Sequence, residues 1–575
     1  MKLLLTAVNA KYIHSNPAVY SLRAYAAEFK ESIEIAEYTI NNKTEAILAD
    51  LFQRAPEVIA FSCYIWNWGM IRELLAELPK ILPETALWLG GPEVSYDAPA
   101  VLEQYPQLTG IMVGEGEETF LELAKYYCRH DRKLTDVSGI CLPGIGMTGE
   151  RELTDLNRIP FFYEDMEPFA NRILYYESSR GCPYRCSYCL SSIDKRVRLR
   201  DPETVKRELQ FFLDHNVPQV KFVDRTFNCN HAHASGIWQY LLEHDNGVTN
   251  FHFEISADIL TEGELAILRR MRPGLVQLEI GVQTTNPDTI REIRRTMNLE
   301  RLREVVERIH EGRNIHVHLD LIAGLPYEDY DSFVISFNEV YAMRPDQLQL
   351  GFLKVLKGSY MYEKAGNYGI NYRSAPPYEV LYSKWISYEE LLRLKRVEEM
   401  VELYYNSNQF RHTLRALETA FAHPFQLYER LAAYYEENGY FLNSPSRAYR
   451  YDVLLAFARA ADAEREALYR ETLTYDMYLR EKCKSRPVFA ADLTPYKETL
   501  RRLEWDKKEH IDRFFYPVWE EDAGRMARRR HSPAFVHFCY ERRNPLSRNA
   551  ETVIEECGSS VTEVVANDET YKRDS

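Results

Sequence analysis

Short apolar runs alternate with amphipathic stretches over about the first 140 residues, and this alternation restricts the fold more than any other feature. Apolar runs of this length predict buried strands, and the amphipathic stretches between them predict helices. The predicted strands are residues 3–8, 33–38, 58–62, 87–89 and 111–113. Strict alternation of strands and helices indicates an α/β fold, a doubly wound parallel sheet with helices on both faces.

A second alternating series follows a turn-rich stretch that contains Pro143, Gly144, Gly146 and Gly149. Its predicted strands are residues 173–178, 220–224, 251–256, 276–280, 316–322 and 347–351. Six such units fit a partial parallel barrel better than a closed eight-unit barrel, which typically needs about 250 residues. We therefore expect a first domain over residues 1–145, a linker over 146–170 and a partial (βα)6 barrel over 171–370.

The strand pattern stops near Pro376, and helical periodicity follows. Ser387-Tyr388-Glu389-Glu390 is a capping box that predicts a helix start. We expect a mostly helical domain over residues 371–548 and a disordered acidic tail over 549–575. Many of the 40 tyrosines fall within residues 360–451, where packing of helices is favoured over binding of a flat substrate.

The chain is acidic, with 71 Lys and Arg against 86 Asp and Glu and a formal net charge of −15. This charge disfavours a general polyanion binder, so nucleic acid is not an expected partner. No segment approaches the roughly 18–20 consecutive apolar residues of a membrane span. The apolar run at Leu3–Leu5 is too short for a signal peptide. We therefore expect a cytoplasmic protein without a membrane partner.

Three of the ten cysteines are clustered, in the sequence Cys182-Pro-Tyr-Arg-Cys186-Ser-Tyr-Cys189. They follow the first predicted barrel strand, and catalytic groups of βα barrels lie at such strand ends. A structural zinc site needs a fourth protein ligand, and no further Cys or His lies close in the sequence. A [4Fe–4S] cluster held by three cysteines instead leaves one iron open for a substrate or cofactor.

The C-x-x-x-C-x-x-C spacing after a strand resembles that of the radical S-adenosylmethionine (SAM) enzymes. This resemblance implies that Cys182, Cys186 and Cys189 ligate a [4Fe–4S] cluster, whose open iron binds SAM. Reductive cleavage of SAM then yields a 5′-deoxyadenosyl radical. Tyr188 matches the aromatic position that packs near adenine, and an ordinary core contact remains the alternative for this side chain.

Three further segments along the barrel resemble the branch of that family that carries a cobalamin-binding domain. Asp224 opens a D-x-x-F-x-x-N pattern, Glu279 and Gln283 belong to an E-x-G-x-Q-T segment, and Gly324 belongs to a Gly-Leu-Pro turn. The resemblance implies that these four residues contact SAM. Each segment is weak alone, and Tyr327-Glu328-Asp329 departs from the usual Gly-Glu-Thr, so the loop there is expected to differ in shape.

The first domain resembles the Rossmann-like cobalamin (B12)-binding module of the same class, and the whole layout resembles a subgroup with an uncharacterised helical C-terminal domain. The resemblance implies cobalamin contacts from the ends of the predicted strands, at Asn9, His14, Ser62, Gly90, Gly91, Gly114, Glu115 and Gly116. The common D-x-H-x-x-G motif is absent. Either cobalt has no protein imidazole, which is favoured, or His14 contributes by another geometry.

The resemblance implies a cobalamin-dependent radical SAM enzyme, most simply a methyltransferase that transfers methyl from methylcobalamin to an unactivated carbon. Its partners would be a small-molecule or peptide substrate and a reductant such as flavodoxin or ferredoxin. The alternatives are a non-methylating rearrangement or cyclisation, and a non-catalytic cobalamin or SAM sensor. A methylthiotransferase acting on tRNA would need a second cysteine-rich site, and only Cys63, Cys128 and Cys141 precede the motif.

Overall fold

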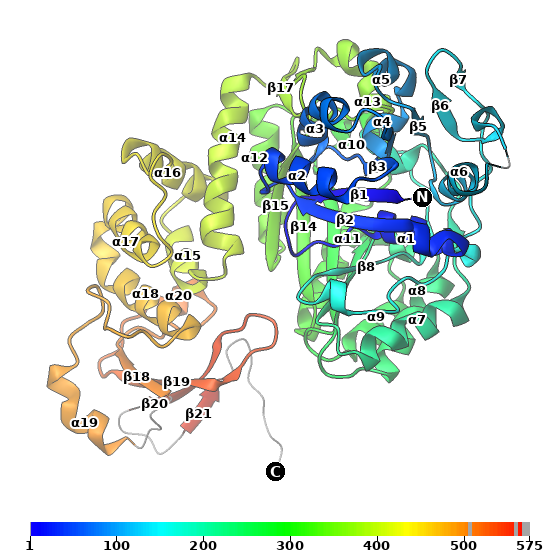
Figure 1. The fold of residues 1–575 in the computed structure, drawn as a ribbon. Helices are drawn as coiled ribbons and strands as arrows, with labels where there is room; N and C mark the ends of the chain where they lie inside the picture. The colour runs from blue at the N-terminus through cyan, green and yellow to red at the C-terminus, as the bar shows by residue number, and fades with distance from the viewer. Residues whose placement is uncertain (1, 131, 504–508, 557–561, 566–575) are drawn as a thin grey trace.

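The computed structural model describes residues 2–130, 132–503, 509–556 and 562–565, which form an N-terminal lobe, a barrel and a C-terminal region (Figure 1). Among the helices of these residues, none combines the length and the apolar character that crossing a membrane requires.

The N-terminal lobe contains a seven-stranded sheet in the order β2-β1-β3-β4-β5-β6-β7, whose first five strands are parallel. Its strands are β1 Leu3–Asn9, β2 Ile33–Thr39, β3 Val58–Ser62, β4 Ala86–Gly90, β5 Gly110–Met112, β6 Ile140–Leu142 and β7 Gly146–Met147. Its helices are α1 Pro17–Tyr25, α2 Thr44–Arg54, α3 Trp68–Ile81, α4 Pro92–Ser95, α5 Ala98–Gln104 and α6 Glu117–Arg129. α1 and α6 pack on one face, whereas α2, α3 and α5 pack on the other. The predicted doubly wound parallel sheet is thus confirmed, and the antiparallel edge strands β6 and β7 extend it.

The barrel is a six-stranded parallel sheet in the order β15-β14-β13-β12-β11-β8. Its strands are β8 Leu174–Tyr176, β11 Gln219–Phe222, β12 Asn250–Ile255, β13 Val276–Gln283, β14 His316–Ala323 and β15 Gln347–Phe352. Its helices are α7 Pro202–Asp214, α8 His231–Glu243, α9 Glu262–Arg269, α10 Pro287–Glu292, α11 Leu299–Gly312 and α12 Tyr330–Ala342. β8 and β15 are the two end strands of the sheet, so the barrel is a partial one, as predicted.

The C-terminal region is largely helical and ends in an antiparallel sheet. Its helices are α13 Tyr360–Lys364, α14 Tyr388–Met400, α15 Arg411–Glu418, α16 Pro424–Glu437, α17 Tyr449–Ala461, α18 Glu466–Arg480, α19 Lys497–Arg502 and α20 Ala523–Met526. Its strands are β16 Asn371–Tyr372, β17 Val380–Tyr382, β18 Glu509–Phe514, β19 Ala534–Arg543, β20 Ala550–Glu556 and β21 Thr562–Val565. Seven tyrosines of α16, α17, α18 and the segment after α14 are almost fully buried, which agrees with a packing role: Tyr404, Tyr428, Tyr435, Tyr451, Tyr469, Tyr475 and Tyr478.

The predicted disordered tail differs from the structure at its beginning. Residues 550–556 form β20, which pairs with β19, and Ala550, Thr552 and Ile554 point into the core beside α18. The segments 557–561 and 566–575 of the predicted tail lie outside the described residues.

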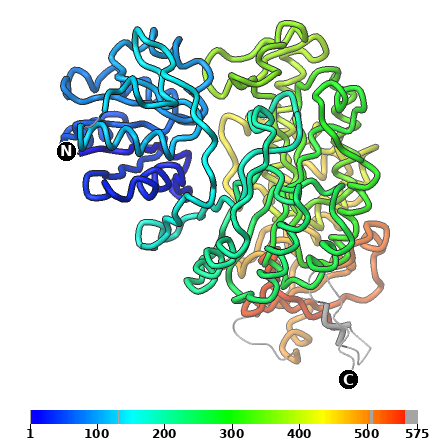
Figure 2. The backbone as a smooth tube through the Cα atoms, turned by 90° about the vertical axis from the view of Figure 1, so that its right-hand side faces the viewer, coloured from blue at the N-terminus to red at the C-terminus, as the bar shows by residue number. Residues whose placement is uncertain are grey.

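The N-terminal lobe lies beside the barrel, while the C-terminal sheet lies at the opposite end of the molecule (Figures 1 and 2). His14 forms an isolated parallel bridge with Ile173, just before β8. Arg172 and Glu37 form an ion pair of 2.7 Å across the same contact. The loop after β1 therefore meets the end strand of the partial barrel.

Candidate functional site

The three clustered cysteines lie in a loop, residues 181–197, that a two-stranded ribbon closes at its base. The ribbon consists of β9 (Ser179–Arg180) and β10 (Arg198–Leu199), in which Arg180 and Arg198 are direct partners. Gly181 has a φ of +97°, and a Cβ there would lie 2.2 Å from the carbonyl oxygen of Arg196. Only glycine permits this closure. We call residues 181–197 the cysteine loop.

The spacing of the thiols fits a polynuclear cluster better than a single metal ion. A tetrahedral site with Zn–S bonds near 2.3 Å brings its sulfur atoms to about 3.8 Å from one another. Among the described residues, the one group of potential ligand atoms within 4.8 Å of one another is Glu279, His318 and Asp320, without the cysteines. A wider spacing suits a [4Fe–4S] cluster, whose cysteines bind different iron atoms.

Arg295 lies against this loop, although the sequence analysis did not single it out. Its guanidinium lies 3.9 Å from Cys186 Sγ and 3.4 Å from the Tyr188 hydroxyl, and it donates to the Gly281 carbonyl. Tyr188 and Cys186 raise the pKa of Arg295 although burial acts against them. A fixed positive charge therefore faces one of the three thiols. Nothing in the local sequence distinguishes Arg295 from the neighbouring Arg294.

Gln283 is the second polar group beside this arginine. It ends β13 with a φ of +73°, and its amide nitrogen lies over Gly281, where a Cβ would be only 2.2 Å away. The amide oxygen is buried and accepts no hydrogen bond from the described residues. A buried acceptor without a hydrogen-bond partner, close to the guanidinium of Arg295, can bind a ligand that has both donor and acceptor groups, as SAM has.

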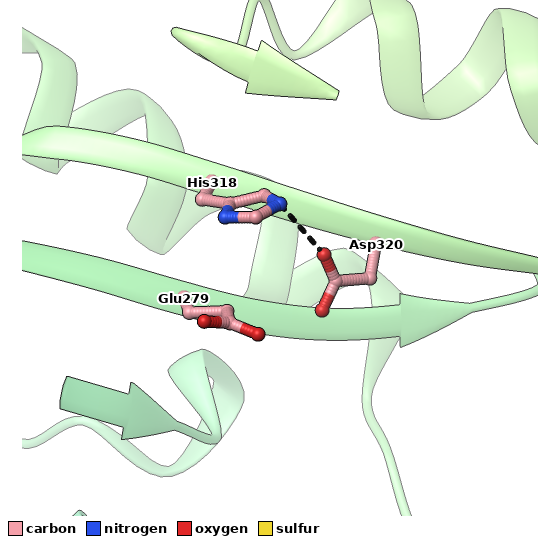
Figure 3. Close-up of side chains that lie close together, drawn as sticks. All are labelled: Glu279, His318 and Asp320. Carbon is pink, nitrogen blue, oxygen red and sulfur yellow. Dashed lines mark ion pairs between the residues drawn. The ribbon is translucent and has the colours of Figure 1, made fainter. Parts of the chain in front are cut away.

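Polar side chains line the interior of the barrel on adjacent strands. They are Lys221, His252, Glu254, Glu279, His318 and Asp320. Glu279 lies 2.9 Å from both Lys221 Nζ and His252 Nε2, and these groups hold its pKa well below the usual range although burial opposes them. Asp320 pairs with His318 at 3.0 Å on the next strand (Figure 3). Glu279 is thus an ionised wall residue of the barrel interior.

Asp224 and Gly324, two of the predicted SAM contacts, both lie against other parts of the protein. Asp224 is 1% exposed and accepts hydrogen bonds from Ser178 and Ser179. It therefore holds the backbone at the base of the cysteine loop in place. A Cβ on Gly324 would lie 2.7 Å from Val380 of β17. This glycine therefore permits close packing of the C-terminal region against the barrel.

The loop after β1 is held by protein contacts at its predicted cobalamin-binding residues. The Asn9 amide donates to Glu37 at 2.9 Å and to the His14 carbonyl at 3.2 Å. His14 Nδ1 lies 2.7 Å from the Tyr175 hydroxyl of β8. Burial, followed by Lys11 and Lys221, lowers the pKa of His14. His14 therefore lies at the junction with the barrel, where its imidazole contacts Tyr175.

The remaining predicted residues gather at the carboxyl edge of the sheet but differ in their surroundings. Ser62 pairs with Gly90, and a Cβ on Gly91 would lie 2.5 Å from the Cys63 carbonyl oxygen. A Cβ on Gly116 would lie 3.0 Å from Leu22. Gly114 is exposed, with a φ of +81° and no atom within 4 Å of its Cβ position. Gly114 is thus the glycine at which a cofactor can approach the backbone.

The carboxylate of Glu115, a predicted cobalamin contact, forms hydrogen bonds with other residues of the chain. It accepts hydrogen bonds from Arg198 and from the Thr154 amide at 2.8 Å, and it lies 3.4 Å from Arg180. Burial opposes ionisation here, yet Arg198, Arg180 and Thr154 together lower the pKa of Glu115 to about 2. Glu115 therefore contacts the two arginines at the base of the cysteine loop.

Three protein families match three successive parts of the chain. Residues 3–124 match the B12 binding domain, and residues 176–340 match the radical SAM superfamily. The chain joins a B12-binding domain to a radical SAM domain. Residues 366–554 match a third family, described as a protein of unknown function, DUF4080. The B12-binding domain implies cobalamin, and the radical SAM domain implies a [4Fe–4S] cluster and SAM.

The chain is homologous to cobalamin-dependent radical SAM methyltransferases. It is 24% identical over 311 residues to the cobalamin-dependent radical SAM methyltransferase TokK of Streptomyces tokunonensis, covering 48% of this chain and 44% of TokK. It is 23% identical over 284 residues to the anaerobic magnesium-protoporphyrin IX monomethyl ester cyclase of Rubrivivax gelatinosus, covering 46% of this chain and 51% of the cyclase. The matches thus span about half the length of these relatives.

Solved structures share the fold at low sequence identity. The cobalamin-dependent SAM radical enzyme OxsB, with aqua-cobalamin and SAM bound, aligns with a TM-score of 0.55 at 16% identity, over 82% of this chain and 78% of OxsB. The radical SAM methyltransferase TsrM from Kitasatospora setae aligns with a TM-score of 0.54 at 17% identity, over 65% of this chain and 78% of TsrM.

Proposed function

We propose that this chain is a cobalamin-dependent radical SAM enzyme that methylates an unactivated carbon atom of its substrate. The main support is the contact between the base of the cysteine loop and the loop after β5. Arg180, two residues before Cys182, donates to Glu117 of the B12-binding domain at 2.8 Å. The proposed sites for the cluster and for cobalamin would therefore adjoin one interface between two domains.

When bound, the cluster supplies the electron for reductive cleavage of SAM, and cobalamin carries the methyl group. The chain's own residues hold and orient these groups. Cys182, Cys186 and Cys189 would ligate the cluster, and Arg295 places a positive charge beside Cys186. The buried amide oxygen of Gln283 would accept a hydrogen bond from SAM. The loop at Gly114 leaves room for cobalamin at the edge of the sheet.

The experiment is anaerobic reconstitution of the full chain with iron, sulfide and hydroxocobalamin, followed by reduction through flavodoxin or ferredoxin and incubation with methyl-labelled SAM. We expect release of 5′-deoxyadenosine, and transfer of label to substrate once a cell extract supplies it. Cys186→Ala should lose iron and 5′-deoxyadenosine formation together. The matched control is Cys229→Ala, a thiol near Cys182 that lies outside the motif and should keep both.

The same experiment separates the alternatives. Formation of 5′-deoxyadenosine without label in any product would contradict methylation. That result would favour ring formation or another rearrangement, the candidate suggested by the resemblance to the anaerobic cyclase. Binding of both cofactors without 5′-deoxyadenosine under any reductant would favour a sensor.

A further inference from the structure

Two arginines lie side by side at the base of the cysteine loop. Arg180 and Arg198 are direct partners in the β9–β10 ribbon, so their positive charges are held close together on adjacent strands. Both side chains are largely buried, with 23% and 19% of their surfaces exposed. Like charges on adjacent strands destabilise a ribbon unless acidic groups compensate them. Part of this compensation comes from Glu177 and Asp194 of the same domain, and the rest comes from the B12-binding domain.

Two carboxylates of the B12-binding domain surround these arginines. Glu115 accepts from Arg198 through both oxygens and lies 3.4 Å from Arg180. Glu117 accepts from Arg180 at 2.8 Å and is 7% exposed. Glu177, just before the ribbon, accepts from Arg180 at 2.9 Å and 2.7 Å. Burial lowers the pKa of Arg180, but Glu177 and Glu117 outweigh it and raise this pKa well above its usual value.

The acidic partners directly follow Gly114, which is the only one of the four predicted cobalamin-binding glycines without an atom within 4 Å of its Cβ position. Gly114, Glu115, Gly116 and Glu117 are consecutive, and Glu117 begins α6. A ligand that rests on Gly114 would therefore fix the backbone that carries both carboxylates. Because charge-assisted bidentate bonds are directional, a fixed Glu115 also fixes Arg198 and the end of the cysteine loop.

We propose that Glu115 and Glu117 clamp Arg180 and Arg198, so that cobalamin binding is transmitted to the cysteine loop and secures the cluster. The two arginines and two glutamates are thus positioning residues that act through the loop. This inference rests on the proposed function in that the loop must hold a cluster and the domain must bind cobalamin. The coupling would keep a cluster most secure when the second cofactor is in place.

The experiment measures how fast a ferrous chelator removes iron from the reconstituted, anaerobic, reduced full chain, with and without hydroxocobalamin. In the wild type, we expect hydroxocobalamin to slow iron loss by roughly 5-fold or more, since coupling between two sites is typically about 5- to 150-fold. Glu115→Gln should still bind hydroxocobalamin and iron, but the protection should fall below about 2-fold. The electron paramagnetic resonance spectrum of its reduced cluster should no longer respond to hydroxocobalamin.

Two further variants separate coupling from general damage. Glu118→Gln is the matched control, since Glu118 lies on the same helix but contacts Tyr25 at 2.6 Å instead of the ribbon; its protection should equal that of the wild type. Arg198→Lys keeps the charge but loses the bidentate geometry, and its protection should be intermediate.

Either of two outcomes would overturn the clamp. One is equal protection in Glu115→Gln and in the wild type, and the other is no protection in a wild type that binds both cofactors. If the wild type takes up no cluster or no cobalamin, the proposed function itself fails, which is a distinct result.

Discussion

Asp224 is the residue whose position most changes its interpretation. It is fully buried below the cysteine loop and accepts hydrogen bonds from the Ser178 amide and from the hydroxyls of Ser178 and Ser179. Burial raises the pKa of Asp224 from 3.8 to about 6, and the three hydrogen bonds only partly oppose this shift. The folded protein therefore binds this proton more tightly than the unfolded chain does.

Asp224→Asn tests this position through its pH dependence. Between about pH 4 and pH 6 the folded wild type holds a proton that the unfolded chain has released, so its stability falls as pH rises, by up to about 3 kcal/mol. Asparagine cannot ionise, so the variant should gain thermal stability relative to the wild type across this window and keep that gain above it. Thermal unfolding at half-unit steps of pH measures the difference, with the exposed Asp288→Asn as control. A difference that does not vary with pH would contradict the assignment.

At the scale of single residues, the sequence predicted the features that depend on residues close together in the chain. The three clustered cysteines lie within one loop, so their spacing alone predicted a shared metal centre. Glu115 and Arg295 act on partners 83 and 109 residues away, and local pattern carries no signal for such contacts. These contacts appear only once the fold brings distant segments together, within the barrel for Arg295 and between two domains for Glu115.

The segment Val401–Asn406, which continues α14 as one π-helical turn, shows how an element closes the edge of the barrel. The Asn406 amide accepts from the Leu348 amide at 2.9 Å and donates to the Leu348 carbonyl at 2.9 Å. Leu348 lies on β15, an end strand of the sheet. Unpaired backbone amide and carbonyl groups of such an edge strand can pair with strands of other chains. Asn406 therefore acts as a side-chain substitute for a neighbouring strand.

Asn406→Ala removes both hydrogen bonds to this strand. We expect a loss of roughly 2–3 kcal/mol, because a backbone amide and carbonyl lose their partners. We also expect faster hydrogen exchange at residues 347–352 and a greater tendency to aggregate. The exposed Asn443→Ala is the control, and hydrogen exchange followed by mass spectrometry is the measurement. Unchanged exchange on β15 would show that the strand does not depend on this contact.

β20 shows where sequence reasoning about elements fails. Its sequence is Ala-Glu-Thr-Val-Ile-Glu-Glu. Buried and partly exposed residues alternate along it, as they do in a strand with one buried face. The acidic composition of the surrounding segment favoured disorder instead. Pairing with β19 and packing against α18 supply the burial that the segment alone cannot provide. Tertiary pairing thus overrides composition.

Across the whole molecule, the C-terminal region reaches back to the B12-binding domain. Tyr378 lies just before β17, and its hydroxyl donates to Glu93 of the short helix α4, which directly follows β4. Glu93 is 4% exposed, and burial raises its pKa, whereas Tyr378 and Lys357 oppose that shift. Lys357 also pairs with Asp97 at 2.7 Å. The residues after β4 and β5 are therefore held by the C-terminal region and by the radical SAM domain respectively.

Tyr378→Phe tests this long-range contact. The variant leaves the Glu93 carboxylate buried without its donor, so its pKa should rise further while that of the unfolded chain stays the same. The charged form then becomes costly, and the loss of stability should grow as pH rises through the folded-state pKa, reaching about 1–3 kcal/mol at pH 8 and staying smaller at pH 5. Thermal unfolding at both pH values measures it, and Tyr382→Phe, which is 46% exposed on β17, is the control. An equal loss at pH 5 and pH 8 would mean that the hydroxyl does not act through the charge of Glu93, and that the C-terminal region is not tied to the residues after β4 through this charge.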